Sequence, residues 1–157
     1  DVYKRQLSVS AIRSDRHRPQ LASVGLPFLM VELKDREALE KARPNLDAFL
    51  VFQMQGAAMT HLYVRSEDEF DLRTRMFAPL AGVTEDPANG SANCALAGLL
   101  AHLEEGVDRE YNWRIAQGVE MGRPSELRAR ARKQNSVVTT TWIGGNCVQV
   151  AEGNLHI

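Results

Sequence analysis

The segment GVTEDPANGSANCALAGLL, residues 82–100, decides the fold of this chain. Its first part holds two acids, a proline and the pair Asn89-Gly90, all of which favour a turn. Its second part consists almost wholly of small and apolar residues, as in a helix that protein surrounds on every side. We therefore predict a buried helix over residues 91–104 that begins directly at the turn.

Segments with strand-like alternation lie on both sides of this helix. The predicted strands cover residues 20–33, 58–66, 69–79, 111–121, 125–134, 137–145 and 146–157. We expect the last two to form a hairpin at Gly144-Gly145-Asn146. A second helix is predicted over residues 35–50, with Asp35 as its N-cap.

The predicted class is α+β, with a strongly curved, mostly antiparallel sheet wrapped around a central buried helix and the second helix outside. The pattern shows no βαβ alternation, which argues against a doubly wound sheet. The length of 157 residues suits one domain. Residues 1–6, DVYKRQ, look unlike the rest, and we interpret them as an adaptor or read boundary outside a domain of residues 7–157.

The composition indicates a globular protein without a strong charge, since 44% of residues are hydrophobic and the net charge is −1. Such a charge favours neither nucleic acid nor an anionic membrane, and no run of about 18 apolar residues predicts a membrane-spanning helix. Arginines cluster in ELRARARKQ, but they alternate with apolar residues as in a half-exposed strand. Two cysteines are too few for a disulfide scaffold, so a reducing cytoplasm is the simplest setting.

The start of the predicted buried helix has the chemistry of an anion site. The first turn of a helix leaves backbone N–H groups without partners, and the helix dipole places about half a positive charge there. Gly90 lets a ligand approach the backbone, and Ser91 can cap the helix or donate to a ligand. Asp86 would lie near this positive end, which favours its ionised form as a proton acceptor or an anchor for a substrate amine or hydroxyl.

Structural explanations of the same residues stay open. Asp, Asn and Ser before a helix are ordinary capping residues, and spacing alone favours that explanation. Glu85 suits the same role as Asp86, although one of two adjacent acids usually points to solvent. A nucleotide P-loop is disfavoured because its Gly-Lys-Ser/Thr ending is absent.

We predict no metal site, because the histidines lack the spacing of metal ligands. They are His17, His61, His102 and His156, and each is expected to be a surface residue or a satisfied core residue. Trp113 and Trp142 lie in alternating strands, where we expect them to fill the core or a dimer face.

Several motifs resemble the phenazine-biosynthesis PhzF-like isomerase family. The main one is RMFAPLAGVTEDPANGSANCALAGLL, residues 75–100. The segments SVGLPFLMVEL, QGVEMGRPSELR and WIGGNCVQVAEGNL resemble further parts of the family pattern, in the expected order. The resemblance covers nearly the whole chain after residue 6.

The resemblance implies the diaminopimelate epimerase-like fold, in which two similar halves each wrap a sheet around a central helix and the active site lies between them. This sequence resembles the C-terminal half only. The implied activity is a cofactor-independent isomerisation, in which a proton leaves one carbon of a small carboxylated metabolite and returns elsewhere; one member isomerises a dihydro-hydroxyanthranilate. The full-length protein is expected to be a homodimer. The family's acid/base glutamate lies in the first half, so we expect this chain alone to be inactive.

The resemblance also assigns residues. Asp86 matches the active-site aspartate, and Gly90 and Ser91 match the Gly-Ser pair that binds substrate. Asn89 stands where the family usually has threonine, so it keeps the hydrogen-bonding capacity and lacks the methyl group. This change leaves an alternative open, namely a non-catalytic family member that only binds small anions.

Other side chains are not assigned to catalysis. Related epimerases use paired cysteines as bases, but Pro87 and Ala88 occupy the corresponding turn here. Cys94 is expected to pack as a small apolar residue. Glu32 and Glu37 lie in the second-half region, so neither is given the role of the acid/base glutamate.

Overall fold

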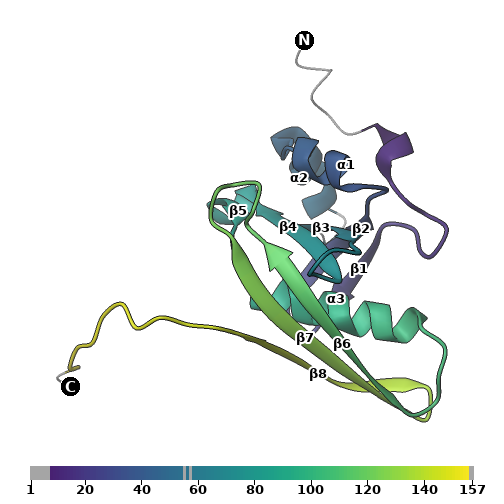
Figure 1. The fold of residues 1–157 in the computed structure, drawn as a ribbon. Coiled ribbons are helices and arrows are strands. Elements are labelled where there is room, and N and C mark those ends of the chain that lie inside the picture. The colour runs from purple at the N-terminus through teal and green to yellow at the C-terminus, as the bar shows by residue number, and fades with distance from the viewer. Residues whose placement is uncertain (1–7, 55, 57, 156–157) are drawn as a thin grey trace.

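One curved sheet wraps around a central helix in this protein. A computed structural model describes residues 8–54, 56 and 58–155. The eight-stranded sheet has the order β1-β2-β3-β4-β6-β7-β8, with β5 paired to β4, and it encloses helix α3, Gly90–Leu103 (Figure 1). The strands are β1 Gln20–Ser23, β2 Pro27–Glu32, β3 Thr60–Arg65, β4 Leu72–Ala78, β5 Val83–Asp86, β6 Arg109–Gln117, β7 Ser125–Gln134 and β8 Val137–Gly145. The predicted curved sheet around a central helix is therefore confirmed, but protein does not surround the helix on every side, because Ser91 and His102 are exposed and Cys94 and Gly98 are half-buried.

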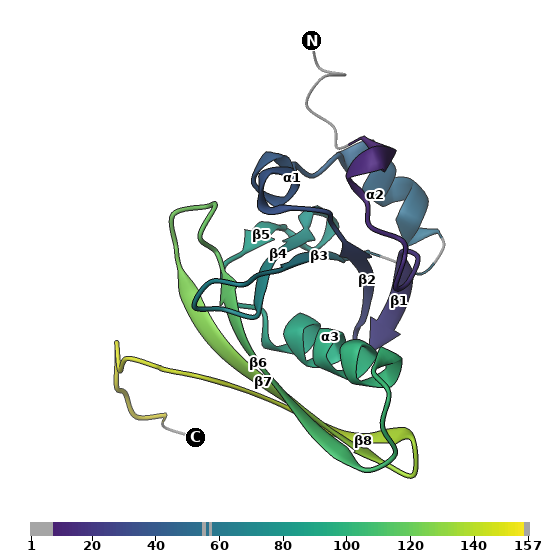
Figure 2. The same cartoon turned by 45° about the vertical axis from the view of Figure 1, so that its right-hand side comes forward.

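Two short helices, α1 (Arg36–Lys41) and α2 (Leu46–Gln53), lie on the other side of the sheet from α3 (Figure 2). Helix α1 and most of α2 fall within the single region predicted to be helical, residues 35–50; Pro44 interrupts that region, and α2 continues to Gln53. Asp35 caps α1 as predicted, because its carboxylate accepts a hydrogen bond from the amide of Ala38 at 2.8 Å. Two further 3₁₀ turns cover Val9–Ala11 and Pro79–Ala81.

Alternate residues of the central strands pack into two separate hydrophobic cores, one on each face of the sheet. On β2, Met30 packs with the α3 side, whereas Val31 packs with the α1 and α2 side. On β4 the same division separates Met76 from Phe77. Strands β2, β3 and β4 are thus covered on both faces, which explains why nearly all of their residues are buried, including Arg73 and Arg75.

The sheet is mixed rather than purely antiparallel. Strands β2 and β3 are parallel and are joined through α1 and α2, and β4 and β6 are parallel and are joined through α3. The absence of βαβ alternation inferred from the sequence is therefore wrong. The helical signal of residues 35–50 marked such a crossover, because parallel neighbours need a connection of a dozen or more residues.

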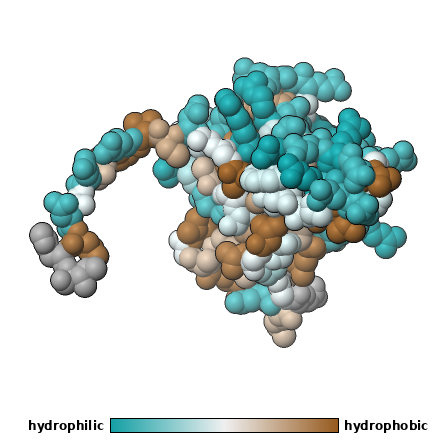
Figure 3. Space-filling view, turned by 90° about the horizontal axis from the view of Figure 1, so that it is seen from below, coloured by the Kyte–Doolittle hydropathy of each residue, from teal (hydrophilic) through white to brown (hydrophobic). Residues whose placement is uncertain are grey.

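The predicted terminal hairpin is also wrong. Strand β8 pairs with β7 through a turn at Asn135 and Ser136, both of which have positive φ angles of 49° and 65°. Residues 146–155 form no strand and extend away from the body (Figures 1 and 3). Val148 and Val150 alternate along this tail as in a strand but are 86% and 92% exposed, since no described strand lies beside them. Residues 156–157 and the residues 1–6 set aside from the domain lie outside the described part.

A buried ion pair links β4, β5 and the end of α1. Arg75 on β4 makes a bidentate pair with Glu85, with both N–O distances at 2.8 Å. The remaining Arg75 nitrogen donates to the carbonyls of Leu39 and Ala42 at the end of α1. The side chains of Arg75 and Glu85 are 4% and 12% exposed, so Glu85 does not point to solvent. It pairs with Arg75 and is linked through Arg75 to α1.

Replacing Arg75 by methionine should destabilise the fold by about 3 kcal/mol, because the removal of one partner strands the other charge away from water. A matched control is Arg36→Met, which breaks a pair with Glu40 on the exposed side of α1 and should change stability little. Urea unfolding of both variants measures the difference. Equal losses would contradict the role of the buried pair.

Candidate functional site

Helix α3 begins with an asparagine cap. The Oδ1 atom of Asn89 accepts a hydrogen bond from the amide of Ala92 at 2.8 Å, so Asn89 rather than Ser91 caps the helix. The amides of Gly90 and Ser91 precede the first residues that have an intrahelical acceptor, and they form the positive end of the helix dipole. Gly90 is half-buried, whereas Ser91 is exposed.

Residues 86–89 connect β5 to α3, and we call them the mouth loop. The carboxylate of Asp86 accepts a hydrogen bond from the amide of Ala88 at 3.0 Å and another from Nδ2 of Asn89 at 2.9 Å. The half-buried carboxylate therefore lies beside the first turn of α3, where a negative charge is favourable to the dipole.

Two carbonyl groups of the mouth loop accept hydrogen bonds from buried amide side chains. Gln117, the last residue of β6, donates from Nε2 to the carbonyl of Asp86 at 2.6 Å. Asn93, in the first turn of α3, donates from Nδ2 to the carbonyl of Asn89 at 2.8 Å. Asn93 also donates to Oε1 of Gln117 at 2.6 Å, so the two amides form one unit. The mouth loop is thus held from inside the protein.

His61 on β3 extends this network. Its Nε2 lies 3.1 Å from Oδ1 of Asn93, and its side chain is fully buried. Burial lowers the pKa of His61 to about 4, although the hydrogen bond with Asn93 and the charge of Asp86 both act to raise it. The imidazole is therefore neutral at pH 7. Its Nδ1 is buried and has no hydrogen-bond partner among the described residues.

Gly118 brings the end of β6 against the mouth loop. Its φ of +77° is a left-handed conformation that glycine adopts without strain. A Cβ atom at this position would lie 2.8 Å from the carbonyl oxygen of Pro87 and 2.2 Å from that of Arg123. The close approach of Gly118 to Pro87 therefore requires glycine.

The structure brings Asp86, Asn89 and Gly90 together at the helix start, with the hydroxyl-bearing Ser91 next along the exposed side. The sequence did not single out Asn93 and Gln117, and it placed His61 among ordinary surface or core histidines. Asn93 lies in a helix that is otherwise largely apolar, and Gln117 directly follows the apolar pair Ile115 and Ala116; these are the signals that mark them. Among described residues no three His, Cys, Asp or Glu side chains form a group that could hold a metal.

A second charged cluster lies at the opposite end of α3. The phenol of Tyr63 donates to Glu32 at 3.0 Å and lies 2.6 Å from Nε2 of His17. Burial and the nearby Glu32 carboxylate raise the pKa of Tyr63. Arg65 lies 3.7 Å from Glu32 and 3.6 Å from Glu104, the C-cap of α3. Glu32 is 1% exposed, so it braces the fold at this end rather than facing the helix start.

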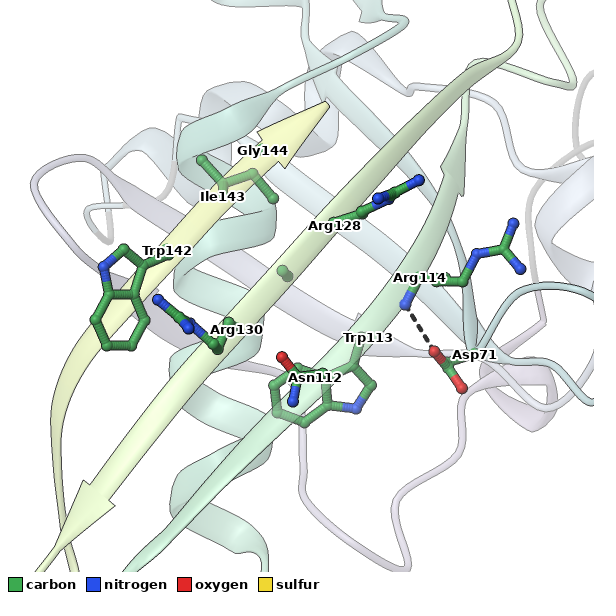
Figure 4. A pocket seen from close by; sticks show the side chains of 10 residues that line it. Asp71, Asn112, Trp113, Arg114, Arg128, Arg130, Trp142, Ile143 and Gly144 are labelled. Carbon is green, nitrogen blue, oxygen red and sulfur yellow. Dashed lines mark hydrogen bonds between the residues drawn. The ribbon is translucent and has the colours of Figure 1, made fainter. Parts of the chain in front are cut away.

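The outer face of β6, β7 and β8 carries a pocket of about 440 Å³ (Figure 4). Arg130 stacks on Trp142 at 4.0 Å and lies 3.8 Å from Glu110, a carboxylate that also pairs with Arg132 at 2.5 Å. The arginines of β7 alternate with buried residues, which confirms the half-exposed strand expected from the sequence.

Trp113 packs partly against the α3 core, whereas Trp142 lies on this outer face. Cys94 is half-buried and donates to the hydroxyl of Thr141 at 3.1 Å.

Gly118→Ala should destabilise the protein by about 2 kcal/mol more than Gly122→Ala, because only the first forces a methyl group into a packed backbone. Both glycines have a φ of +77°, but a Cβ at Gly122 meets nothing within 4 Å. The backbone strain is therefore shared and cancels in the comparison. Urea unfolding measures both losses, and similar values would show that the contact with Pro87 is not tight.

The buried His61 should make stability fall as the pH drops. Its folded pKa of about 4 lies below the ordinary 6.5, so the unfolded chain alone binds the proton between these values. The contribution is fully present above pH 6.5, and about 3 kcal/mol is lost on the way down to pH 4. Urea unfolding at several pH values should show a shallower decline for His61→Gln. An unchanged decline would contradict the neutral, buried state.

Comparisons with known proteins agree on one family. The family model described as phenazine biosynthesis-like protein matches residues 3–153. An uncharacterized isomerase of Mesorhizobium japonicum is 32% identical over 157 residues, which cover 96% of this chain and 52% of that protein. The trans-2,3-dihydro-3-hydroxyanthranilate isomerase of Pseudomonas fluorescens is 42% identical over 120 residues, which cover 71% of this chain and 42% of that enzyme.

A solved structure supports the fold. The phenazine biosynthesis protein of the PhzF family from Bacillus anthracis superposes with a TM-score of 0.65 at 21% identity, covering 88% of this chain and 50% of that one. The predicted fold class is thereby confirmed. No helix of the described residues is long and apolar enough to cross a membrane. The chain spans about half the length of the curated relatives it matches over most of its residues. With the family model covering nearly all of its residues, this chain belongs to the PhzC-PhzF family of phenazine biosynthesis-like proteins.

Proposed function

We propose that this chain is the C-terminal half of a cofactor-independent isomerase that moves a proton between carbon atoms of a small carboxylated metabolite. The observation that carries the proposal is the juxtaposition of the Asp86 carboxylate with the amides at the start of α3. Relatives with isomerase names support the reaction class. The proposal keeps the homodimeric, cytoplasmic parent expected from the sequence.

In this proposal the start of α3 binds the carboxylate of the substrate. The amides of Gly90 and Ser91 supply N–H donors, and the helix dipole favours the negative charge. Ser91 is exposed, so its hydroxyl is accessible to a ligand that lies against the helix start. Asn89 uses its Oδ1 for the cap and its Nδ2 for Asp86, so it shapes the site rather than donating to the substrate.

Asp86 would orient the reacting part of the substrate or share its proton. Two donors from the mouth loop fix the carboxylate, which leaves its remaining lone pairs for a substrate amine or hydroxyl. The general base that takes the proton from carbon would come from the first half of the parent protein. A cyclic amino-bearing carboxylate suits this arrangement, and dihydro-hydroxyanthranilate, the compound in the name of one relative, is such a molecule.

A non-catalytic anion-binding protein is the second candidate. The observation that favours it is the bracing role of Asp86, whose carboxylate already accepts two hydrogen bonds within its own turn. A purely structural aspartate would make the same contacts.

Asp86→Ala in the full-length parent should lower turnover of a dihydro-hydroxyanthranilate-type substrate by about 10²- to 10⁴-fold, as expected for the loss of a group that handles a proton. Asp86→Asn preserves the shape of the turn and should lose nearly as much activity. Circular dichroism and thermal unfolding would establish that both variants fold.

Solvent deuterium separates the two candidates. An isomerase should incorporate deuterium from heavy water into its carboxylate ligand, whereas a pure binder would leave the ligand unlabelled. Activity of Asp86→Asn within a few-fold of the wild-type value would remove Asp86 from the chemistry.

A further inference from the structure

The network behind the mouth loop connects four elements through side chains that are all fully buried. Its members are His61 on β3, Thr74 on β4, Asn93 on α3 and Gln117 on β6, each with 0% exposure. A buried polar side chain that lacks a partner costs stability, so such networks persist where every amide is satisfied. Here both amide side chains end on backbone carbonyls of the mouth loop.

The two carbonyls set the direction of every hydrogen bond in the network. A carbonyl can only accept, so the NH₂ group of Gln117 must face Asp86 and the NH₂ group of Asn93 must face Asn89. The oxygen of Gln117 then accepts from Asn93, and the oxygen of Asn93 accepts from His61. His61 must therefore carry its proton on Nε2, and its tautomer reports the orientation of the mouth loop.

Thr74 adds a weaker contact that fits the same directions. Its hydroxyl lies 3.4 Å from the oxygen of Asn93 and 3.3 Å from the oxygen of Gln117, and its single O–H group can donate to either of these acceptors. The hydroxyl thus supports the amide orientation from β4.

Backbone contacts also restrain both ends of the mouth loop: Asp86 pairs with Met76 of β4, and the carbonyl of Asn89 accepts a second hydrogen bond, from the backbone amide of Asn93 at 3.3 Å. Asp86 and Asn89 bond each other and Ala88 within the loop, and these local contacts move with it. Gly118 packs against Pro87 without a directional bond. The bonds from the side chains of Asn93 and Gln117 tie the loop to the buried network in addition. Without them the carbonyl of Asp86 would lose its side-chain donor and the carbonyl of Asn89 would keep only the backbone amide of Asn93, so the loop would hold Asp86 and the amides of the helix start less firmly.

We propose that Asn93 and Gln117, supported by His61, are positioning residues that set the Asp86 carboxylate and the helix-start amides in the geometry that turnover requires. This inference rests on the proposed isomerase function, because it concerns the same site. None of the three side chains contacts the substrate; they act through the backbone of the mouth loop.

The test uses the full-length parent with three variants. Gln117→Met and Asn93→Leu keep side-chain volume and remove the donors to the mouth loop. Ile115→Ala is the control, since Ile115 is a fully buried neighbour on β6 whose truncation destabilises the core without touching the loop. Each variant is assayed for turnover at saturating substrate, thermal unfolding, and amide hydrogen exchange of peptides that span residues 82–93.

We expect Gln117→Met and Asn93→Leu to lower kcat by roughly tenfold to a hundredfold, the size of effect that a small misplacement of a catalytic group produces. Hydrogen exchange in the mouth loop should be faster in both. Ile115→Ala should lose at least as much thermal stability and keep kcat within threefold.

Unchanged exchange in the mouth loop of Gln117→Met and Asn93→Leu would overturn the inference, as would unchanged kcat with altered exchange. A similar fall of kcat in Ile115→Ala would also overturn it, because the effect would then follow stability alone. A wild-type parent without turnover would instead overturn the proposed function, and hydrogen exchange would still decide whether the network holds the loop.

Discussion

The carbonyl groups of Asp86 and Asn89 accept hydrogen bonds from side chains that have no access to water. A buried polar group that loses its partner costs about 1–3 kcal/mol, so the fully buried amide groups of Gln117 and Asn93 need these acceptors. The two donors come from different elements, and their bonds link the end of β6 to the start of α3. The rest of the site depends on these bonds. The Asn89 cap, the turn at Asp86 and the packing of Gly118 all depend on the position of the mouth loop.

Much of the fold could be predicted from the sequence, because one physical constraint dominates it. A helix as apolar as residues 91–104 has to bury most of its surface, and the alternating strands wrap around it, leaving one stripe at Ser91, Cys94, Gly98 and His102 outside the core. The N-cap at Asp35 and the half-exposed pattern of β7 could also be predicted, since both depend only on residues that are neighbours in the sequence. Asp86, Asn89 and Gly90 could also be predicted to lie together, because they are consecutive in one turn.

The rest could not be predicted because it depends on residues that are distant in the chain. The tail at residues 146–155 has strand-like alternation, and a strand needs a neighbour that the local pattern does not specify. The turn at Asn135 and Ser136 lacks glycine, so it gave a weaker signal than Gly144-Gly145. Asn93 and Gln117 are 24 residues apart, and nothing local to either one indicates that they share a hydrogen bond.

An anion site made of backbone amides places unusual demands on the loop that carries it. A side-chain donor can change rotamer to follow its ligand, but an N–H group points wherever the backbone directs it. Preorganised donors stabilise developing charge best when no reorganisation is needed at the moment of reaction. In the proposed isomerase the rigidity of the mouth loop is therefore part of the chemistry. In that proposal, the fully buried polar side chains of Asn93 and Gln117 serve to hold the loop in place.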